Sequence, residues 1–211
     1  MAIIVIGGHS RDVGKTSVMA GLIAALSEHH WTAFKITQYG HGICSRKGKV
    51  CQCACATADH SWAISEEKDR SGESDTSRFL LAGARRAWWV RSEQGRLGEA
   101  MPAIYRKLSE SENSIVESNS IMRFLSPDLY LTVLDPATGD FKRSAREFLD
   151  SADAIILHDK VLSGQTTGWG MDLNRIRKPR PIFRIRPPNY VDRTIVQYVK
   201  ERLEKSSDRR P

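Results

Sequence analysis

The amino-acid sequence predicts an α/β fold with a mostly parallel, doubly wound sheet flanked by helices. Short apolar runs alternate along the 211 residues with segments of helical periodicity, the order expected of repeated strand–helix units. Several of these runs lack alternating polar residues, as expected for strands that helices cover on both faces. We expect strands at residues 2–7, 32–37, 86–91, 114–117, 129–135, 154–158 and 181–186.

Helical patterns fill the intervals between these runs. Val18, Leu22 and Leu26 recur at a spacing of four residues, which predicts an amphipathic helix directly after the first strand. The same spacing recurs near the C-terminus and predicts a last helix there, carrying Ile195, Val199 and Leu203. Shorter helices are expected at residues 77–84 and 141–149.

The chain is expected to form one domain over residues 1–205, followed by a disordered tail at residues 206–211. A stretch at about residues 39–74 is poor in aliphatic residues and rich in Gly, Ser, Cys and charge. Long loops in compact domains are usually functional or disordered, so we interpret this stretch as an inserted Cys-rich loop.

A glycine-bearing loop joins the first strand to the first helix, which is the context of a phosphate-binding P-loop. Gly8 and Gly14 let the backbone turn so that its N–H groups converge on phosphate oxygens. Lys15 can bridge the β- and γ-phosphates, and the Thr16 hydroxyl can bind Mg²⁺. The predicted nucleotide-binding residues are Gly8, His9, Ser10, Asp12, Val13, Gly14, Lys15, Thr16 and Ser17.

The loop departs from the usual pattern, because five residues rather than four separate Gly8 from Gly14, and His9 stands where the first glycine normally falls. This form resembles dethiobiotin synthetase, whose loop reads Gly-Thr-Asp-Thr-x-Val-Gly-Lys-Thr. Ser10 and the run Val13-Gly14-Lys15-Thr16 fit that loop, and Gly8 fits as its opening glycine.

Two further stretches resemble the molybdopterin-guanine dinucleotide biosynthesis protein B family. The run Phe34-Lys35-Ile36-Thr37-Gln38-Tyr39-Gly40-His41-Gly42 is similar to that family's second strand, which ends in Lys-His-His-Gly-His. The run Asp75-Thr76-Ser77-Arg78, followed by Ala82-Gly83-Ala84, is similar to its Asp-x-x-Arg…Ala-Gly-Ala segment. Both families belong to a larger P-loop group that includes nickel and cobalt metallochaperone GTPases. The resemblance covers about residues 1–45 and 73–160.

The resemblance and the expected sheet single out three charged residues. A lysine at the position of Lys35 contacts substrate and phosphate in the synthetase, and Lys35 ends the strand expected beside the P-loop strand. Glu117 stands where both families carry Val-Glu-Gly, and Asp75 is a second carboxylate. We therefore expect Lys15, Lys35 and Glu117 as catalytic residues, and Thr16, Glu117 and Asp75 as Mg²⁺ ligands. The alternatives are a surface lysine for Lys35 and helix caps for Glu117 and Asp75.

All four cysteines fall within twelve residues, at Cys44, Cys51, Cys53 and Cys55. Clustered thiols in a polar loop are typical of soft-metal ligands, and Zn²⁺ is the first candidate. Against this, the spacing lacks the Cys-x2-Cys knuckles of structural zinc sites. Reactive surface thiols or a redox-labile loop are the alternative interpretations.

The composition of the chain limits the classes of ligand and partner that it is expected to bind. The net charge of +7 is carried by scattered basic residues, which indicates an anionic substrate rather than nucleic acid. No apolar run approaches the ~20 residues of a membrane span, and residues 2–6 form a strand pattern rather than a signal peptide, so a cytoplasmic protein is expected. Related P-loop proteins are usually dimers, so we expect a homodimer, in which Trp88 and Trp89 could be partly exposed.

The leading functional prediction is a protein that binds GTP or ATP with Mg²⁺ and hydrolyses it slowly, resembling molybdopterin-guanine dinucleotide biosynthesis protein B. One alternative is an ATP-dependent small-molecule ligase or kinase like dethiobiotin synthetase, which would need a second substrate. Another is a metallochaperone GTPase that acts with a partner protein. The sequence leaves the base and the second substrate or partner open.

Overall fold

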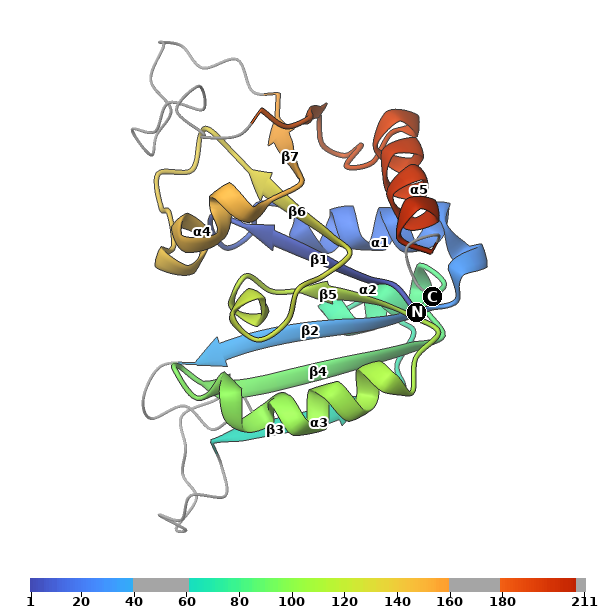
Figure 1. Cartoon of the computed structure of the whole chain (residues 1–211), viewed down its shortest axis with the longest axis vertical. Coiled ribbons are helices and arrows are strands. Elements are labelled where there is room, and N and C mark those ends of the chain that lie inside the picture. The colour runs from blue at the N-terminus through green and yellow to red at the C-terminus, as the bar shows by residue number, and fades with distance from the viewer. Residues whose placement is uncertain (40–60, 160–178, 208–211) are drawn as a thin grey trace.

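The computed structural model describes residues 1–39, 61–159 and 179–207. Within these residues, eight strands form one sheet in the order β3-β4-β2-β5-β1-β6-β7-β8 (Figure 1). All neighbouring strands are parallel except β3, which runs antiparallel to β4. The strands are β1 Ile3–Gly8, β2 Trp31–Tyr39, β3 Trp62–Glu66, β4 Arg86–Glu93, β5 Asn113–Glu117, β6 Leu129–Leu134, β7 Ala154–His158 and β8 Ile182–Ile185. The predicted fold class is confirmed.

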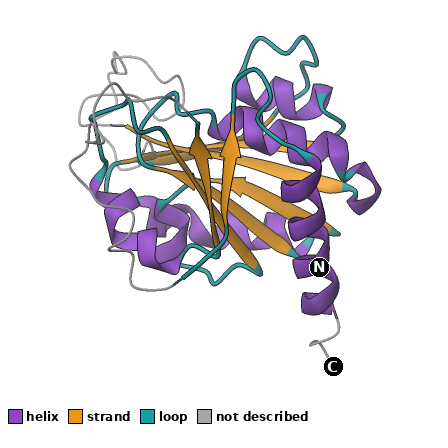
Figure 2. Cartoon of the chain, turned by 90° about the horizontal axis from the view of Figure 1, so that it is seen from above, coloured by secondary structure: helices purple, strands orange, loops and turns teal. Residues whose placement is uncertain are grey.

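Helices cover both faces of the sheet (Figure 2). One face carries α1, α2 and α5, which pack on apolar side chains such as Ile4, Ile6 and Leu131. The other face carries α3, which packs on side chains such as Val5, Phe34 and Val116. Apolar residues thus point both ways from the same strands, which explains their near-continuous apolar runs. The helices are α1 Lys15–Ala25, α2 Asp75–Leu81, α3 Leu97–Ser109, α4 Arg143–Phe148 and α5 Arg193–Ser207, with short 3-10 turns η1 Ser27–His29, η3 Ser120–Arg123 and η4 Leu149–Ser151.

Two elements depart from the expectations. Strand β3 lies inside the stretch interpreted as a loop; its residues are only half-buried, and it forms by pairing with β4, with Ile64 opposite Val90. Helix α3 carries Pro102 in its interior, and because proline has the lowest helix propensity, the residue propensities alone do not predict a helix there. Its buried Leu97, Met101, Ile104 and Leu108 nevertheless keep a helical spacing that could have revealed it.

The C-terminal boundary also shifts. Helix α5 continues to Ser207, so residues 206 and 207 are helical rather than part of a disordered tail. The Ser206 hydroxyl donates a hydrogen bond to Asp128 ahead of β6, which ties the last turn to the sheet. The remainder of the predicted tail, residues 208–211, lies outside the described residues.

The two tryptophans of β4 face opposite sides of the sheet. Trp88 is buried, and Lys107 of α3 lies over its ring. Trp89 is half-buried and donates from Nε1 to Thr37 Oγ1 at 3.1 Å. Trp88 therefore belongs to the core, and the homodimer stays a prediction. No helix among the described residues is both long and apolar enough to cross a bilayer.

Candidate functional site

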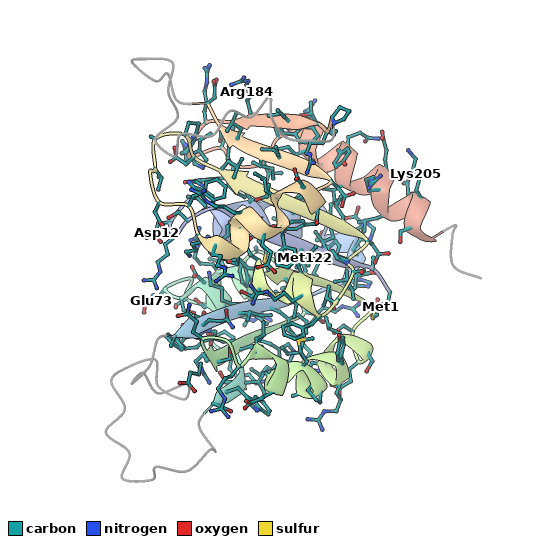
Figure 3. All side chains as sticks on the ribbon, turned by 60° about the vertical axis from the view of Figure 1, so that its left-hand side comes forward. Met1, Asp12, Glu73, Met122, Arg184 and Lys205 are labelled. Carbon is teal, nitrogen blue, oxygen red and sulfur yellow. The ribbon has the colours of Figure 1, made fainter. Side chains whose placement is uncertain are left out.

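The candidate site lies where the parallel strands end. The arrowheads of β1 and β2 point to the same edge of the sheet (Figure 1), and the loop between β1 and α1 follows there. Figure 3 shows Asp12 of this loop on the same side of the molecule as Glu73, which precedes α2. Ligands of open α/β sheets bind at the carboxyl ends of the strands, so this edge is the place to expect one.

The loop leaves β1 under tight steric control. A Cβ atom on Gly7 would overlap Asn119 Oδ1 and lie 2.5 Å from Tyr130 Oη, so only glycine fits there. The Asn119 amide then binds both backbone groups of Gly8: its Oδ1 accepts from Gly8 N at 2.9 Å, and its Nδ2 donates to Gly8 O at 2.8 Å. Asn119 therefore fixes the entrance of the loop, a role that was not predicted from the sequence.

The loop ends at Gly14, which adopts the left-handed conformation with φ 88° and directly precedes α1. A Cβ atom at this position would lie 2.9 Å from Tyr190 Cδ1 and closer still to Cε1. Both the backbone and the neighbouring ring therefore demand glycine here. The first N–H groups of α1 carry the partial positive charge of a helix N-terminus, which suits an anion.

His9 holds the loop against β6. Its side chain is fully buried, its backbone N–H donates to Val133 O at 3.3 Å, and Asp135 N lies 3.4 Å from its Nδ1. His9 Nδ1 also lies 3.5 Å from Val133 O, and burial lowers the pKa of the ring. The ring and the backbone N–H of His9 thus anchor the loop, and its predicted contact with a nucleotide stays a prediction.

Two more contacts complete the frame of the loop. His158 of β7 binds Val13 O through Nε2 at 2.9 Å, and its ring meets that of Tyr190 edge-on. The Ser10 hydroxyl donates to Asp140 Oδ2 at 2.9 Å. The loop is therefore held by side chains from β7 and from the segment that follows β6.

Lys15 begins α1 and folds back over the loop. Its Nζ donates to Ser10 O at 2.7 Å, while its aliphatic carbons lie above Gly8. Burial lowers the pKa of Lys15 to about 8, with Lys142 and Lys35 lowering it further and Glu117 opposing them. An ammonium group that is poorly solvated and close to other cations is prepared to bind a highly charged anion.

The predicted Mg²⁺ ligands Thr16, Glu117 and Asp75 come together around Lys35. Strands β2 and β5 place Lys35 level with Glu117, and Lys35 Nζ donates to Glu117 Oε1. The same Nζ lies 2.8 Å from Asp75 Oδ2 and 3.4 Å from Thr16 Oγ1. Thr16 in turn donates to Glu117 Oε2 at 2.8 Å. We call these four residues the charged cluster.

The contacts of the charged cluster test whether Asp75 and Glu117 are helix caps, the alternative left open by the sequence. Ser74, not Asp75, is the N-cap of α2, since its hydroxyl accepts from Ser77 N at 3.0 Å. Glu117 is buried and bonded to Thr16, so it caps no helix. Burial alone would raise the pKa of Asp75, but Lys35, Thr16 and Arg78 together lower it. Burial alone would lower the pKa of Lys35, but Glu117 and Asp75 together raise it.

The remaining predicted residues fall into two groups. Asp12 lies in the loop, where it has a positive φ of 54°. Ser17 lies in the first turn of α1, and its hydroxyl accepts a hydrogen bond from Arg78 Nη2 at 3.1 Å. The proposed zinc ligands Cys44, Cys51, Cys53 and Cys55 lie outside the described residues. Among the residues that are described, no group of three or more His, Cys, Asp or Glu side chains is placed to hold a metal.

Lys142 joins the site from the segment after β6. Its backbone N–H donates to His9 O at 2.8 Å, which places it directly beside the loop. Burial lowers its pKa, and Arg11 lowers it further. Lys142 was not singled out in the sequence, because only the folded chain brings it next to Lys15.

Comparisons with known proteins give distant structural likenesses. No family model matches the chain. No curated protein matches it either. HypB from Helicobacter pylori in complex with nickel is 13% identical with a TM-score of 0.49, over 97% of this chain and 86% of that one. LpxK from Aquifex aeolicus in complex with ATP is 17% identical with a TM-score of 0.47, over 87% and 53%. MobB from Bacillus subtilis is 16% identical with a TM-score of 0.39, over 96% and 98%.

Proposed function

We propose that this chain binds a nucleoside triphosphate with Mg²⁺ at the P-loop and hydrolyses it slowly. The observation that carries the proposal is the convergence of Thr16, Glu117 and Asp75 on one point beside Lys15, because a hydroxyl and two carboxylates are ligands that Mg²⁺ prefers. The loop amides and Lys15 would hold the β- and γ-phosphates, and the metal would neutralise their charge.

The surroundings of the loop suit the rest of a nucleotide. An open groove adjoins Ser17, and its lining includes Gly21, Arg78 and residues 188–193. A phosphate chain that starts at Lys15 and follows the first turn of α1 would bring its nucleoside end to this groove. Asp159 is paired with Arg186 at 2.6 Å, so we do not assign it to the base, and ATP and GTP both remain candidates.

A second candidate function is phosphoryl transfer to an anionic small molecule, as in a ligase or kinase. The observation in its favour is the position of Lys142, which lies beside the loop together with Lys15 and Lys35. Three ammonium groups exceed what a P-loop needs for the nucleotide alone, and an acceptor substrate with its own negative charge would use the third. A metallochaperone role depends on the four cysteines outside the described residues.

The test is calorimetry of the full chain with ATP, GTP and their non-hydrolysable analogues, each with Mg²⁺ and with EDTA. We expect micromolar or tighter binding of one nucleotide, weakened at least tenfold when the metal is removed. Release of phosphate without any added acceptor would favour the hydrolase, and release only with an anionic acceptor would favour the transferase. Failure of both nucleotides to bind would contradict the proposal.

A further inference from the structure

The position of Lys35 within the charged cluster raises a question about metal binding. A Mg²⁺ ion that binds Thr16, Glu117 and Asp75 needs the oxygen lone pairs that now face the Lys35 ammonium. A monovalent cation and a divalent cation cannot share this point, because their repulsion would act over a few ångströms in a partly buried site. One of the two must leave when the other arrives.

We propose that Lys35 and Mg²⁺ compete for the oxygens of Thr16, Glu117 and Asp75, so that the chain takes up the metal only together with a nucleotide. This inference rests on the proposed function, since the nucleotide supplies the phosphate oxygens to which Lys35 moves. It assigns Lys35 two positions: paired with the carboxylates without nucleotide, and turned toward the phosphates when the metal–nucleotide complex binds.

The geometry favours such an exchange. Lys35 extends from β2, whose neighbour β5 carries Glu117 and pairs in turn with β1, the strand that leads into the loop. The Lys35 ammonium lies 3.4 Å from Thr16 Oγ1 at the start of α1, so phosphates bound at the loop would be within reach of its flexible side chain. Asp75 comes from a different element, the first turn of α2, and its side chain is 42% exposed, so it can follow either cation. Glu117 is held by Thr16 and stays in place.

Charge balance makes the competition selective. Glu117 and Asp75 carry two negative charges and Lys35 cancels one, so the cluster offers a free divalent ion little attraction. A nucleotide draws the ammonium away, and the two carboxylates are then uncompensated until the metal binds. Binding of metal and nucleotide is therefore positively coupled, and the coupling must be the same when measured from either ligand.

The experiment measures binding of Mn²⁺ alone, as a spectroscopic substitute for Mg²⁺, to the wild-type chain and to Lys35→Met. We expect the variant to bind free Mn²⁺ about tenfold or more tightly than the wild type, because one positive charge has been removed from the oxygens. Lys35→Arg keeps the charge and should show no gain. Lys68→Met is the matched control, because Lys68 pairs with Glu66 away from the site.

A second pair of variants guards against poor folding of Lys35→Met, in which Glu117 and Asp75 would face each other without a cation. Asp75→Asn and Lys35→Met/Asp75→Asn differ only in the lysine, and the double variant should bind Mn²⁺ more tightly than the single one. If Mn²⁺ affinity rises neither from wild type to Lys35→Met nor from Asp75→Asn to the double variant, Lys35 does not compete with the metal and the inference is overturned.

The outcome can be separated from that of the proposed function. Titration of the wild type with nucleotide and Mg²⁺ tests the function, whereas the Mn²⁺ comparison tests only the competition. Nucleotide binding with no gain in Lys35→Met would overturn the inference and leave the function intact. A gain in Lys35→Met without any nucleotide binding would overturn the function, while the competition itself would stand.

Discussion

The two flanks of the P-loop are built from different chemistry. On the side of β2 and β5, Lys35 and Glu117 approach it with full charges, and Thr16 connects them to α1. On the side of β6 to β8, His9 and His158 hold the loop through hydrogen bonds, and the Tyr190 ring covers Gly14. We therefore expect the charged flank to bind the ligand, and the other flank, called neutral after these uncharged contacts although Asp140 and Lys142 lie near it, to position the loop. Mutations on the two sides should then have different effects.

Removal of Lys15 should have the largest effect. We expect Lys15→Ala to weaken triphosphate binding roughly 100-fold or more, because Lys15 would supply the charge on the β- and γ-phosphates. The folded state should be unharmed, because removing a poorly solvated ammonium from the loop leaves the apolar core intact. Calorimetry and thermal unfolding measure the two properties, with Lys68→Ala as the control. Equal affinity in variant and wild type would remove the P-loop assignment.

Glu117→Gln should separate metal binding from phosphate binding. The substitution keeps the shape of the side chain but removes one charge from the predicted metal site, so the Mg²⁺-dependent part of nucleotide affinity should fall about tenfold. The free energy of unfolding should fall by about 1–2 kcal/mol, less than for an isolated buried pair, because Lys35 keeps Asp75. Titrations with Mg²⁺ and with EDTA check this. Glu112→Gln, an exposed carboxylate paired with Arg85, should change neither quantity.

The Lys15 side chain should also make stability and nucleotide affinity depend on pH. Burial lowers the pKa of Lys15 from 10.5 to about 8, so between these values the unfolded chain binds more protons than the folded chain. The contribution of Lys15 to the free energy of unfolding is therefore lowest below pH 8 and rises as the pH increases toward 10.5. Nucleotide affinity should run the other way, falling above pH 8 because the ammonium is lost.

Stability and nucleotide affinity should be measured for the wild type and for Lys15→Met across this pH range. The difference between the two proteins isolates the titration of Lys15, since all other titrating groups are present in both. The variant should lack both trends. A wild-type affinity that stays constant up to pH 10 would mean that Lys15 keeps its proton and that its pKa is not lowered.

On the neutral flank, Gly14→Ala should reduce stability through two separable causes. The positive φ and the contact with Tyr190 together should lower the free energy of unfolding by about 2–3 kcal/mol. Gly95→Ala is a matched control, because Gly95 has nearly the same φ of 87° but a Cβ atom there would meet nothing within 4 Å, and it should cost only about 1 kcal/mol. In the double variant Gly14→Ala/Tyr190→Ala, the part of the stability loss that comes from the contact with Tyr190 should disappear, when compared with Tyr190→Ala alone. If Gly14→Ala and Gly95→Ala cost the same, Tyr190 does not press on the loop.

His158→Phe should have the smallest effect. It removes the hydrogen bond to Val13 O and keeps an aromatic ring against Tyr190, so we expect a loss of about 1 kcal/mol in stability. Nucleotide affinity should fall only a few-fold, with an unchanged dependence on Mg²⁺. If His158→Phe weakened nucleotide binding as much as Lys15→Ala, the two flanks would not have the separate roles of binding and positioning.

The sequence predicted the charged flank better than the neutral one, and the reason is geometric. The fold class predicts that Lys35 and Glu117 lie toward the carboxyl edge of a parallel sheet. Two details of that expectation were wrong: β2 continues past Lys35 to Tyr39, and β5 rather than β2 lies beside β1. It is the pairing of β2 with β5 that brings Lys35 next to Glu117. Thr16 is fixed by the loop motif, and Asp75 by the helix that follows. The local sequence pattern therefore predicts which residues reach this edge, whereas their neighbours depend on the strand order.

The neutral flank depends on contacts that no local pattern reveals. Tyr190 and His158 lie far apart in the chain, and only the packing of β7 and β8 brings them together over Gly14. Asn119 could have been suspected from its place two residues after Glu117, but not its two bonds to Gly8. Strand β3 was missed for a related reason, since its pairing with β4 outweighs its own weak strand pattern.

The attachment of residues 40–60 has an evolutionary consequence. The residue before this stretch, Tyr39, accepts a hydrogen bond from Gln94 N at 2.8 Å, and the residue after it, Ser61, accepts one from Glu93 N at 2.7 Å. Both ends are therefore fastened to adjacent residues at the end of β4. Insertions and deletions between these two anchors need not disturb the pairing of β2, β3 and β4, so selection can change the length of the cysteine-bearing stretch without changing the sheet. Natural relatives of this chain should accordingly vary most in length here, while Gly14, Lys15 and Glu117 persist.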